Sequence, residues 1–315
     1  MRALRLHAPG DLRLEDVPDP VPADGDVLLQ VEAALTDGTD LKAYRRGHPV
    51  LLGPPPSPFG HEVCGVDVAT GRRLVPANSA PCGACAACAR GQETLCEQLL
   101  PLLNGAYAEL LLVPARIARR NLVPVPPGLA PEVAAMAEPL ACCLHGLEVA
   151  GVERGDTVAI VGLGPIGLML CACVADAGGH AVGVGSRPSR RALAGSFGAV
   201  AAEPEGADVV IEAAGTVESW QHALALVRPG GTVLAFGGLP REAHVEVDAY
   251  RIHYEEVRLA GAFHHTPRTF RAALAFLASG AFPFERLLTH EVGLEGVAAL
   301  FDAPPEDYLK AVVRP

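Results

Sequence analysis

The chain has 315 residues, half of them hydrophobic, and a formal net charge of −11 at pH 7. This length allows two domains with separate cores, and the apolar content argues against a disordered chain. The acidic charge argues against a nucleic-acid partner or an anionic membrane surface, because both attract basic surfaces.

The first seventeen residues carry charges throughout and have no apolar centre, so we expect no secretory signal peptide there. The longest uncharged run, residues 157–175, contains glycines and a proline where a strand would turn into a helix. We therefore expect a buried strand–turn–helix there, no membrane association, and a cytoplasmic protein. In that reducing compartment, nine cysteines favour metal binding or buried thiols over disulfides.

The predicted elements change in character near residue 145. Short apolar stretches among prolines, such as residues 26–35 and 107–114, are typical of strands in an irregular β-rich domain. Further along, apolar strands alternate with helical segments, and we expect these strands at 157–162, 180–185, 207–215, 231–238 and 257–263. This alternation predicts a doubly wound parallel sheet covered on both faces. A helix is expected at residues 267–280.

Four cysteines lie close together in the first part of the chain, with the spacing C-x2-C-x2-C-x7-C: Cys82, Cys85, Cys88 and Cys96. Four thiolates this close can enclose one tetrahedral Zn²⁺ at about 2.3 Å per bond, which leaves no open position for substrate. We expect a structural zinc site. Two disulfides or four buried thiols are the alternatives, and a nucleic-acid-binding zinc module is disfavoured because Arg90 is the only basic residue of this segment.

A glycine-rich loop follows the strand expected at 157–162. Gly162, Gly164 and Gly167 form the pattern G-x-G-x-x-G, with Pro165 and Ile166 inside it. A strand before the loop and a helix after it are typical of a dinucleotide-binding site, in which the loop and the helix N-terminus bind the pyrophosphate. The alternative is a glycine-rich turn with no ligand.

The end of the second strand of this domain indicates which dinucleotide is bound. An NAD site presents a carboxylate to the ribose about twenty residues after the glycines. Gly185 stands there instead, and it is followed by Ser186, Arg187, Arg190 and Arg191. Arginine binds phosphate bidentately, so we predict NADP rather than NAD. The alternative is that these arginines only form a solvated helix start.

Three more segments carry polar residues among apolar ones: "LTDGTDLKAY", "PFGHEVCG" and "MAEPLACCLHG". With the cysteine segment and "GLGPIG" in this order, the whole chain resembles the zinc-dependent medium-chain dehydrogenases, in a form similar to the polyol and sugar dehydrogenases. The resemblance implies a GroES-like catalytic domain, residues 1–147 with 264–315, and a Rossmann domain, residues 148–263. It also implies a catalytic zinc in the cleft between them.

The family's metal ligands come from the motifs C-G-[ST]-D and G-H-E and from the end of the first domain. The resemblance places Asp37, His61 and Glu138 at these positions, with Glu62 near them as a ligand or a neighbour. Aspartate in place of cysteine makes the donor set harder, so Mn²⁺ or Mg²⁺ can compete with Zn²⁺.

Two further residues receive roles from the same resemblance. Thr39 is expected to hydrogen-bond the alcohol and start a proton relay. Lys42 stands where many relatives carry a relay histidine, and it either contacts substrate or cofactor or lies at the surface.

The sequence thus predicts a zinc-dependent oxidoreductase that transfers a hydride between NADP and a secondary alcohol of a polyol, cyclitol or sugar. Its substrate is a small-molecule alcohol or the corresponding carbonyl. Two alternatives remain, a metal-free NADPH-dependent quinone or enone reductase on this scaffold and an inactive nucleotide-binding relative. Family members are commonly dimers or tetramers, so we expect a homodimer or homotetramer.

Overall fold

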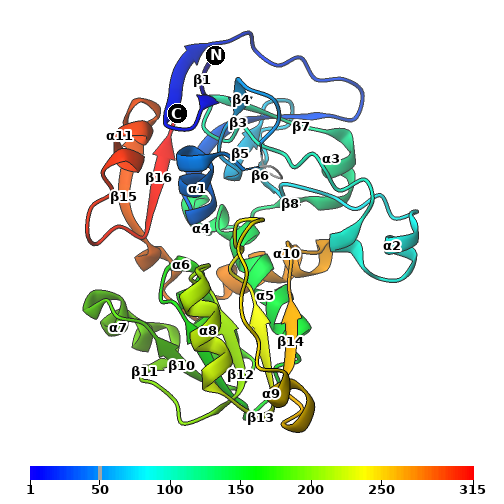
Figure 1. The fold of residues 1–315 in the computed structure, drawn as a ribbon. Helices are drawn as coiled ribbons and strands as arrows, with labels where there is room; N and C mark the ends of the chain where they lie inside the picture. Colours follow the sequence, from blue (N-terminus) through cyan, green and yellow to red (C-terminus); the bar gives the residue numbers. More distant parts are fainter. Residues whose placement is uncertain (49–51) are drawn as a thin grey trace. The chain divides into compact units, whose positions relative to one another are not determined.

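The computed structural model describes residues 1–48 and 52–315, and the chain divides into two compact units. One unit comprises Met1–Ala141 and Thr266–Pro315, and the other comprises Cys142–His265 (Figure 1). The sequence analysis put the boundaries at 147/148 and 263/264. The first observed boundary falls inside helix α5 (Ala137–Ala150), which runs without interruption across it.

The first unit is built mainly from antiparallel strands. A three-stranded sheet has the order β2-β1-β4, and a seven-stranded sheet has the order β15-β16-β3-β5-β6-β8, with β7 also paired to β3. Among the described strands of this unit, only β15 and β16 pair in parallel. The strands are β1 (Arg2–Ala8), β2 (Asp11–Asp16), β3 (Val27–Leu35), β4 (Ser57–Pro58), β5 (Glu62–Asp67), β6 (Arg73–Pro76), β7 (Leu110–Val113), β8 (Leu122–Pro124), β15 (Leu288–Gly293) and β16 (Lys310–Arg314).

The helices of this unit are mostly short. Besides the first turns of α5, they are α1 (Gly38–Arg46), α2 (Ala86–Ala89), α3 (Ala115–Asn121), α4 (Pro131–Ala134), α10 (Pro267–Ser279) and α11 (Val297–Asp302), with 3₁₀ turns at Glu93–Leu95, Phe284–Leu287 and Leu294–Gly296. The predicted helix at 267–280 is confirmed as α10. Thr266 and Thr269 form a capping box at its start, and Gly280 ends it with a left-handed φ of 64°.

The strand register of the seven-stranded sheet brings distant residues together at one end of β3. Leu35, the last residue of β3, is paired with Glu62 of β5 on one side and with Val312 of β16 on the other. The chain segments that follow β3 and precede β5 therefore lie next to each other. They contain Asp37 and His61.

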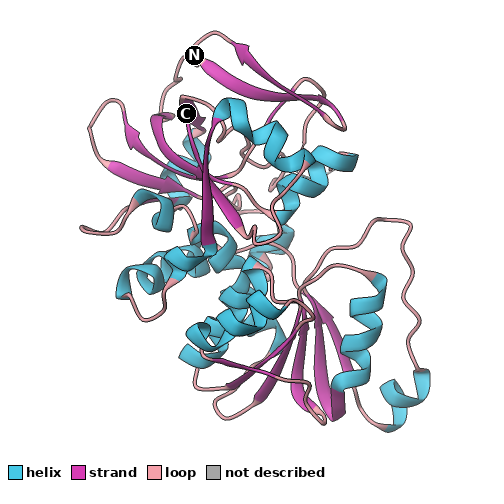
Figure 2. Ribbon diagram, turned by 90° about the vertical axis from the view of Figure 1, so that its left-hand side faces the viewer, coloured by secondary structure: helices cyan, strands magenta, loops and turns pink. Residues whose placement is uncertain are grey.

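The second unit contains a six-stranded sheet with the order β11-β10-β9-β12-β13-β14, and all its strand pairs are parallel. The predicted doubly wound Rossmann sheet is confirmed, with helices on either side of the strands (Figure 2). The elements are β9 (Thr157–Val161), α6 (Pro165–Asp176), β10 (His180–Val184), α7 (Pro188–Ala194), a 3₁₀ turn at Gly195–Phe197, β11 (Ala199–Ala201), β12 (Ala207–Glu212), α8 (Val217–Leu226), β13 (Val227–Ala235), α9 (Ala249–Tyr254) and β14 (Arg258–Gly261).

The apolar run at residues 157–175 is the buried strand β9 followed by helix α6, as predicted. Within the described ranges, one helical stretch, Pro131–Ala150, is long and apolar enough to cross a membrane. Because 67% of that stretch is buried inside the protein, its composition is that of a core helix.

Candidate functional site

Asp37 lies between the end of β3 and the start of α1 and serves as the N-cap of that helix. Its Oδ1 accepts a hydrogen bond of 2.7 Å from the backbone N–H of Asp40. Its other oxygen, Oδ2, lies 3.9 Å from Nε2 of His61. Burial alone would raise the pKa of Asp37, but His61 and Lys310 outweigh burial and lower that pKa below its usual range.

His61 precedes β5 and is buried, with 7% of its surface exposed. Its Nδ1 lies 3.0 Å from Oδ1 of Asp40, so Nε2 is the ring atom that faces Asp37. Burial would lower the pKa of His61, but Asp40 and Asp37 overcome this and raise it well above the usual value. A metal-ligating histidine must present an unprotonated nitrogen, so metal binding at Nε2 would compete with protonation of the ring.

Glu138 lies in the first turn of α5 and is also buried. Asn78 donates a hydrogen bond of 2.9 Å from Nδ2 to its Oε1. Burial raises the pKa of Glu138, while the charge of His61 opposes that shift. Glu138 is thus close enough to act electrostatically on His61, as the ligand prediction requires.

Glu62, the other residue predicted near the metal, already has a cationic partner. Both of its carboxylate oxygens accept hydrogen bonds of 2.7 Å from Nζ of Lys310. Lys310 also donates to the backbone carbonyl of Thr36 at 3.0 Å. Asp37, His61 and Glu62 each place one ligand atom within 4.8 Å of the others. Glu62 is therefore beside the candidate site, but its charge is balanced by Lys310.

Thr39 and Lys42 lie on α1, and both are half-buried. The side chain of Thr39 hydrogen-bonds the carboxylate of Asp37 and helps to lower its pKa. Of the two lysines in the chain, Lys310 and not Lys42 makes the buried contact beside the site.

The donors at this site fit a divalent metal ion. Two ligand atoms at about 2.0–2.2 Å from one ion can be at most about 4.4 Å apart, and the 3.9 Å between Asp37 and His61 is within that limit. A carboxylate bound to the other ring nitrogen, here Asp40, is the usual partner of a metal-ligating histidine. Asp37, His61 and Glu138 would hold the ion.

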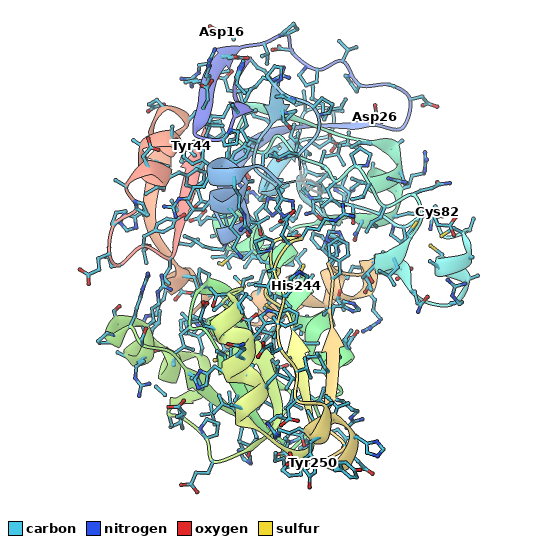
Figure 3. All side chains as sticks on the ribbon, viewed as in Figure 1. Asp16, Asp26, Tyr44, Cys82, His244 and Tyr250 are labelled. Carbon is cyan, nitrogen blue, oxygen red and sulfur yellow. The ribbon has the colours of Figure 1, made fainter. Side chains whose placement is uncertain are left out.

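The four-cysteine segment also fits Zn²⁺. The Sγ atoms of Cys82 and Cys88 are 4.0 Å apart, and those of Cys85 and Cys96 are 3.9 Å apart. Four sulfurs about 2.3 Å from one tetrahedral ion would be about 3.8 Å apart. All nine cysteines, which lie within the described residues, are free of disulfides. Figure 3 shows Cys82 with neighbouring sulfur atoms near α2.

Backbone N–H groups point at these sulfurs, as thiolate ligands require. The backbone N–H groups of Ala84 and Cys85 donate to Sγ of Cys82, and the backbone N–H of Cys82 donates to Sγ of Cys96. Backbone N–H groups of Cys88 and Glu97 lower the pKa of Cys85 to about 6. These contacts stabilise the charged form of Cys82 and Cys85, whereas burial raises the pKa of Cys88 to about 12.

The glycine-rich loop joins β9 to α6. Gly162 has a left-handed φ of 104°. A Cβ on Gly167 would lie 1.8 Å from the carbonyl oxygen of Gly162, so only glycine permits this approach of helix to strand. Gly164 is the N-cap of α6 and has open space around it, with Nη1 of Arg190 as the nearest atom, 3.9 Å from where its Cβ would be. Pro165 and Ile166 form the first turn of α6.

The arginines that follow β10 fall into two groups. Arg191 donates to the backbone carbonyls of Gly185 and Ala201, which ties the ends of β10 and β11 together. Arg190 is half-buried, and burial together with the nearby charge of Arg187 lowers its pKa. Ser186 and Arg187 are exposed. Because Arg191 is occupied with backbone carbonyls, Arg187 and Arg190 are the better candidates to bind an anion near the glycine-rich loop.

Sequence reasoning missed four residues that surround the metal ligands: Asp40, Asn78, Tyr107 and Lys310. Asp40 had a detectable signal, since it closes the predicted motif at residues 37–40. The other three contact the site through long-range contacts that only the sheet register creates.

Comparisons with known proteins agree with this geometry. The model of the alcohol dehydrogenase GroES-like domain matches residues 23–127, and that of zinc-binding dehydrogenases matches residues 165–279. The erythritol/L-threitol dehydrogenase of Mycolicibacterium smegmatis is 30% identical over 336 residues, covering 93% of this chain and 91% of that protein. The D-altritol 5-dehydrogenase of Agrobacterium fabrum is 29% identical over 332 residues, covering 98% and 97%.

Solved structures show the same fold. A protein of Sinorhizobium meliloti 1021 described as a zinc-binding dehydrogenase, and bound to NADP, has a TM-score of 0.90 and 31% identity, covering 100% of this chain and 99% of that one. An alcohol dehydrogenase of Thermus sp. ATN1 has a TM-score of 0.88 and 29% identity, with 100% of both chains covered.

A GroES-like domain and a Rossmann domain in one chain, with these candidate metal residues, define a class of two-domain oxidoreductases. Within that class, the chain belongs to the zinc-type medium-chain alcohol and polyol dehydrogenases. The resemblance stated from the sequence is confirmed.

Proposed function

We propose that this protein is a zinc- and NADP-dependent dehydrogenase that interconverts a secondary alcohol of a polyol, cyclitol or sugar and its carbonyl. The observation that carries the proposal is the arrangement around His61. Asp40 binds one ring nitrogen, and the other faces the carboxylate of Asp37, with Glu138 close by.

The residues would divide the work as follows. Asp37, His61 and Glu138 hold Zn²⁺, which supplies Lewis acidity that lowers the pKa of an alcohol beside it. The protein must then orient the carbinol carbon toward C4 of the nicotinamide and exclude water. Bound NADP⁺ would supply the hydride acceptor, and the chain's own residues would hold the alcohol and take up the proton that its hydroxyl loses on oxidation to the carbonyl.

Thr39 is the proposed first acceptor of that proton. Its side chain hydrogen-bonds Asp37. When the hydroxyl donates to this carboxylate, its oxygen lone pairs remain available to accept from a substrate hydroxyl. Thr39 would thereby hold the alcohol and pass its proton along a relay.

The preference for NADP is supported by the residues after β10. Gly185 brings no carboxylate to repel a 2′-phosphate, and a side chain there would press against Leu163, 3.3 Å away. The charges of Arg187 and Arg190 act on each other, and a phosphate between them would relieve the repulsion. The NADP in the Sinorhizobium meliloti structure agrees with this choice.

The substrate class is supported by the relatives, which are named for erythritol, L-threitol and D-altritol. We also propose a cytoplasmic location, because all nine cysteines, each described, are free. A homodimer or homotetramer is proposed as well, since β14 is an outer strand of its sheet and carries the exposed side chain of Leu259.

The proposal is tested by measuring zinc content and NADP⁺ reduction in one preparation, over a panel of polyols, cyclitols and aldoses. We expect two zinc ions per chain and a higher kcat/KM with NADP⁺ than with NAD⁺. Asp37 is also the N-cap of α1, so comparing Asp37→Asn with Asp37→Ala separates its proposed role as a metal ligand from its role as a helix cap. Asparagine still caps α1, whereas alanine costs about 1 kcal/mol of helix stability, yet both variants should lose one zinc and nearly all turnover.

Two results would contradict the proposal. If the Asp37→Asn variant kept both metal ions and full turnover, the carboxylate of Asp37 would not be a metal ligand. One zinc per wild-type chain, together with NADPH-dependent quinone or enone reduction, would favour the metal-free alternative. Asp24→Ala, an exposed carboxylate, serves as the control.

A further inference from the structure

The hydroxyl group of Tyr107 contacts Asp40, the partner of His61 at the candidate site. Tyr107 is fully buried, and its O–H is within hydrogen-bond distance of Oδ2 of Asp40 and 3.0 Å from the carbonyl oxygen of Leu35. A hydroxyl has one hydrogen to donate, and a charged carboxylate is the stronger acceptor. The bond to Asp40 is therefore the dominant one.

The two oxygens of Asp40 thus have separate partners. Oδ1 lies 3.0 Å from Nδ1 of His61, and Oδ2 accepts from Tyr107. Asp40 itself is completely buried, so no solvent is available to replace either partner. The hydroxyl of Tyr107 fixes the plane of the carboxylate and, through it, the ring of His61.

The position of the Tyr107 ring is closely determined. Gly60 has a left-handed φ of 87°, and a Cβ there would lie 2.6 Å from the ring. The backbone N–H of Tyr107 donates to the carbonyl of Phe59, and its own carbonyl accepts from Leu4. The residue immediately before His61 therefore has to be a glycine for the ring to occupy this place.

We propose that Tyr107 is a positioning residue for the metal site: it holds Asp40, which holds His61 with Nε2 turned toward Asp37. This inference rests on the proposed function, because it concerns the same site. Asp40 is a partner of a ligand, and Tyr107 is one contact further out, so it acts without touching metal, substrate or cofactor.

The test is the zinc affinity of Tyr107→Phe, measured by chelator competition on the full-length protein. Phenylalanine keeps the ring and removes only the hydroxyl, so Oδ2 of Asp40 stays buried but loses the hydrogen bond from Tyr107. We expect zinc at the Asp37 and His61 site to bind about tenfold more weakly, at the lower end of the effect typical for partners of metal ligands. With Co²⁺, the d–d bands should change, while the thiolate charge-transfer band of the cysteine segment should not.

Tyr44→Phe is the matched control. Tyr44 lies on α1, the helix that carries Asp40, and its ring is buried (labelled in Figure 3). Its hydroxyl donates to the carboxylate of Asp302 at 2.6 Å, away from His61. The control loses the same kind of atom, a tyrosine hydroxyl, from the helix that carries Asp40, so it should lower the melting temperature without changing zinc affinity.

A double-mutant cycle with Asp40→Ala shows whether Tyr107 acts through Asp40 or only through the stability of the fold. In that background Tyr107→Phe should have no further effect on zinc affinity, because the side chain that accepts its hydrogen bond is gone. Two metals in the wild type and an unchanged affinity in Tyr107→Phe would overturn this inference alone. A wild type that binds only the thiolate-held metal would overturn the proposed function as well.

Discussion

Glu62 and Lys310 form an ion pair in the interior of the protein, where each charged group needs the other. Both side chains are buried, with exposed fractions of 0% and 1%, and both carboxylate oxygens bind the ammonium group. Burial lowers the pKa of Lys310, but Glu62 and Asp37 more than offset this, so the lysine is charged at neutral pH. Removal of Lys310 leaves Glu62 buried without its cationic partner, and burial already raises the pKa of Glu62 to about 8 with that partner in place.

Lys310→Met should therefore lower the free energy of unfolding by about 3–5 kcal/mol, the usual cost of breaking a buried ion pair. The double variant Glu62→Gln with Lys310→Met should be more stable than Lys310→Met alone, because no charge is left behind. Urea denaturation monitored by circular dichroism measures both values. Lys42→Met, at the half-buried lysine of α1, is the control, and a double variant less stable than the single one would refute this explanation.

At the scale of elements, Asp208 joins three strands of the nucleotide-binding sheet. Its Oδ2 accepts from the backbone N–H of Thr157 at the start of β9, and its Oδ1 accepts from Nε of Arg228 in β13, both at 2.7 Å. The N–H of Thr157, and secondly Arg228, hold the pKa of Asp208 below its usual value. Since Arg228 is half-exposed, the bond to Thr157 contributes the larger share of stability.

Asp208→Asn should cost about 1 kcal/mol at neutral pH. A carboxylate whose pKa is depressed in the folded state stabilises the fold above its unfolded pKa of about 3.9, and this contribution is lost as the pH falls through the folded value. The difference in urea midpoint between wild type and variant should therefore be constant from pH 5 to pH 8 and shrink toward pH 4 and below. A difference that grows on acidification would contradict the argument. Asp176→Asn, an exposed carboxylate at the end of α6, is the control.

At the scale of the whole molecule, two metal sites of different chemistry are proposed for one chain. The cysteine segment offers four sulfurs, all contributed by residues 82–96, whereas the other site offers oxygen and imidazole donors from the separate segments that carry Asp37 and His61, with Glu138 as a further proposed donor. Thiolates are softer ligands and bind Zn²⁺ more tightly than carboxylates do. The two sites should therefore lose metal at different rates.

Dialysis against increasing chelator should first remove one zinc per chain together with dehydrogenase activity, and added Zn²⁺ should restore both. Removal of the second zinc should need a stronger chelator and lower the melting temperature, because metal binding to the cysteine segment contributes folding free energy. Zinc content, activity and thermal melting measured on the same samples check this order. Simultaneous loss of both ions with no change in melting temperature would show that the two sites do not differ as described.

Much of the fold was predictable because it follows from local patterns. The alternation of apolar strands and helices after residue 152 predicted the parallel sheet, and the spacing of the four cysteines predicted that their sulfur atoms lie together. The partners of the predicted metal residues were not predictable in this way. Tyr107 is 67 residues from Asp40, and Lys310 is 248 residues from Glu62.

The partner of Glu62 could not be predicted from sequence patterns. The motif put Glu62 among the metal residues, and composition drew attention to both lysines. Only the register of β16, β3 and β5 assigns Lys310 to Glu62. A lysine in an apolar strand gives no local sign of the carboxylate that it will neutralise.

The amino-acid sequence by itself determined the class of fold and the glycine loop, and its short motifs suggested the candidate metal ligands through a family resemblance, because each motif depends on residues near one another in the chain. The tertiary structure alone decided which nitrogen of His61 faces Asp37 and which charges balance Glu62. Those outcomes depend on strand pairing, which brings side chains from distant segments into one buried volume where each charge or polar atom must find a partner.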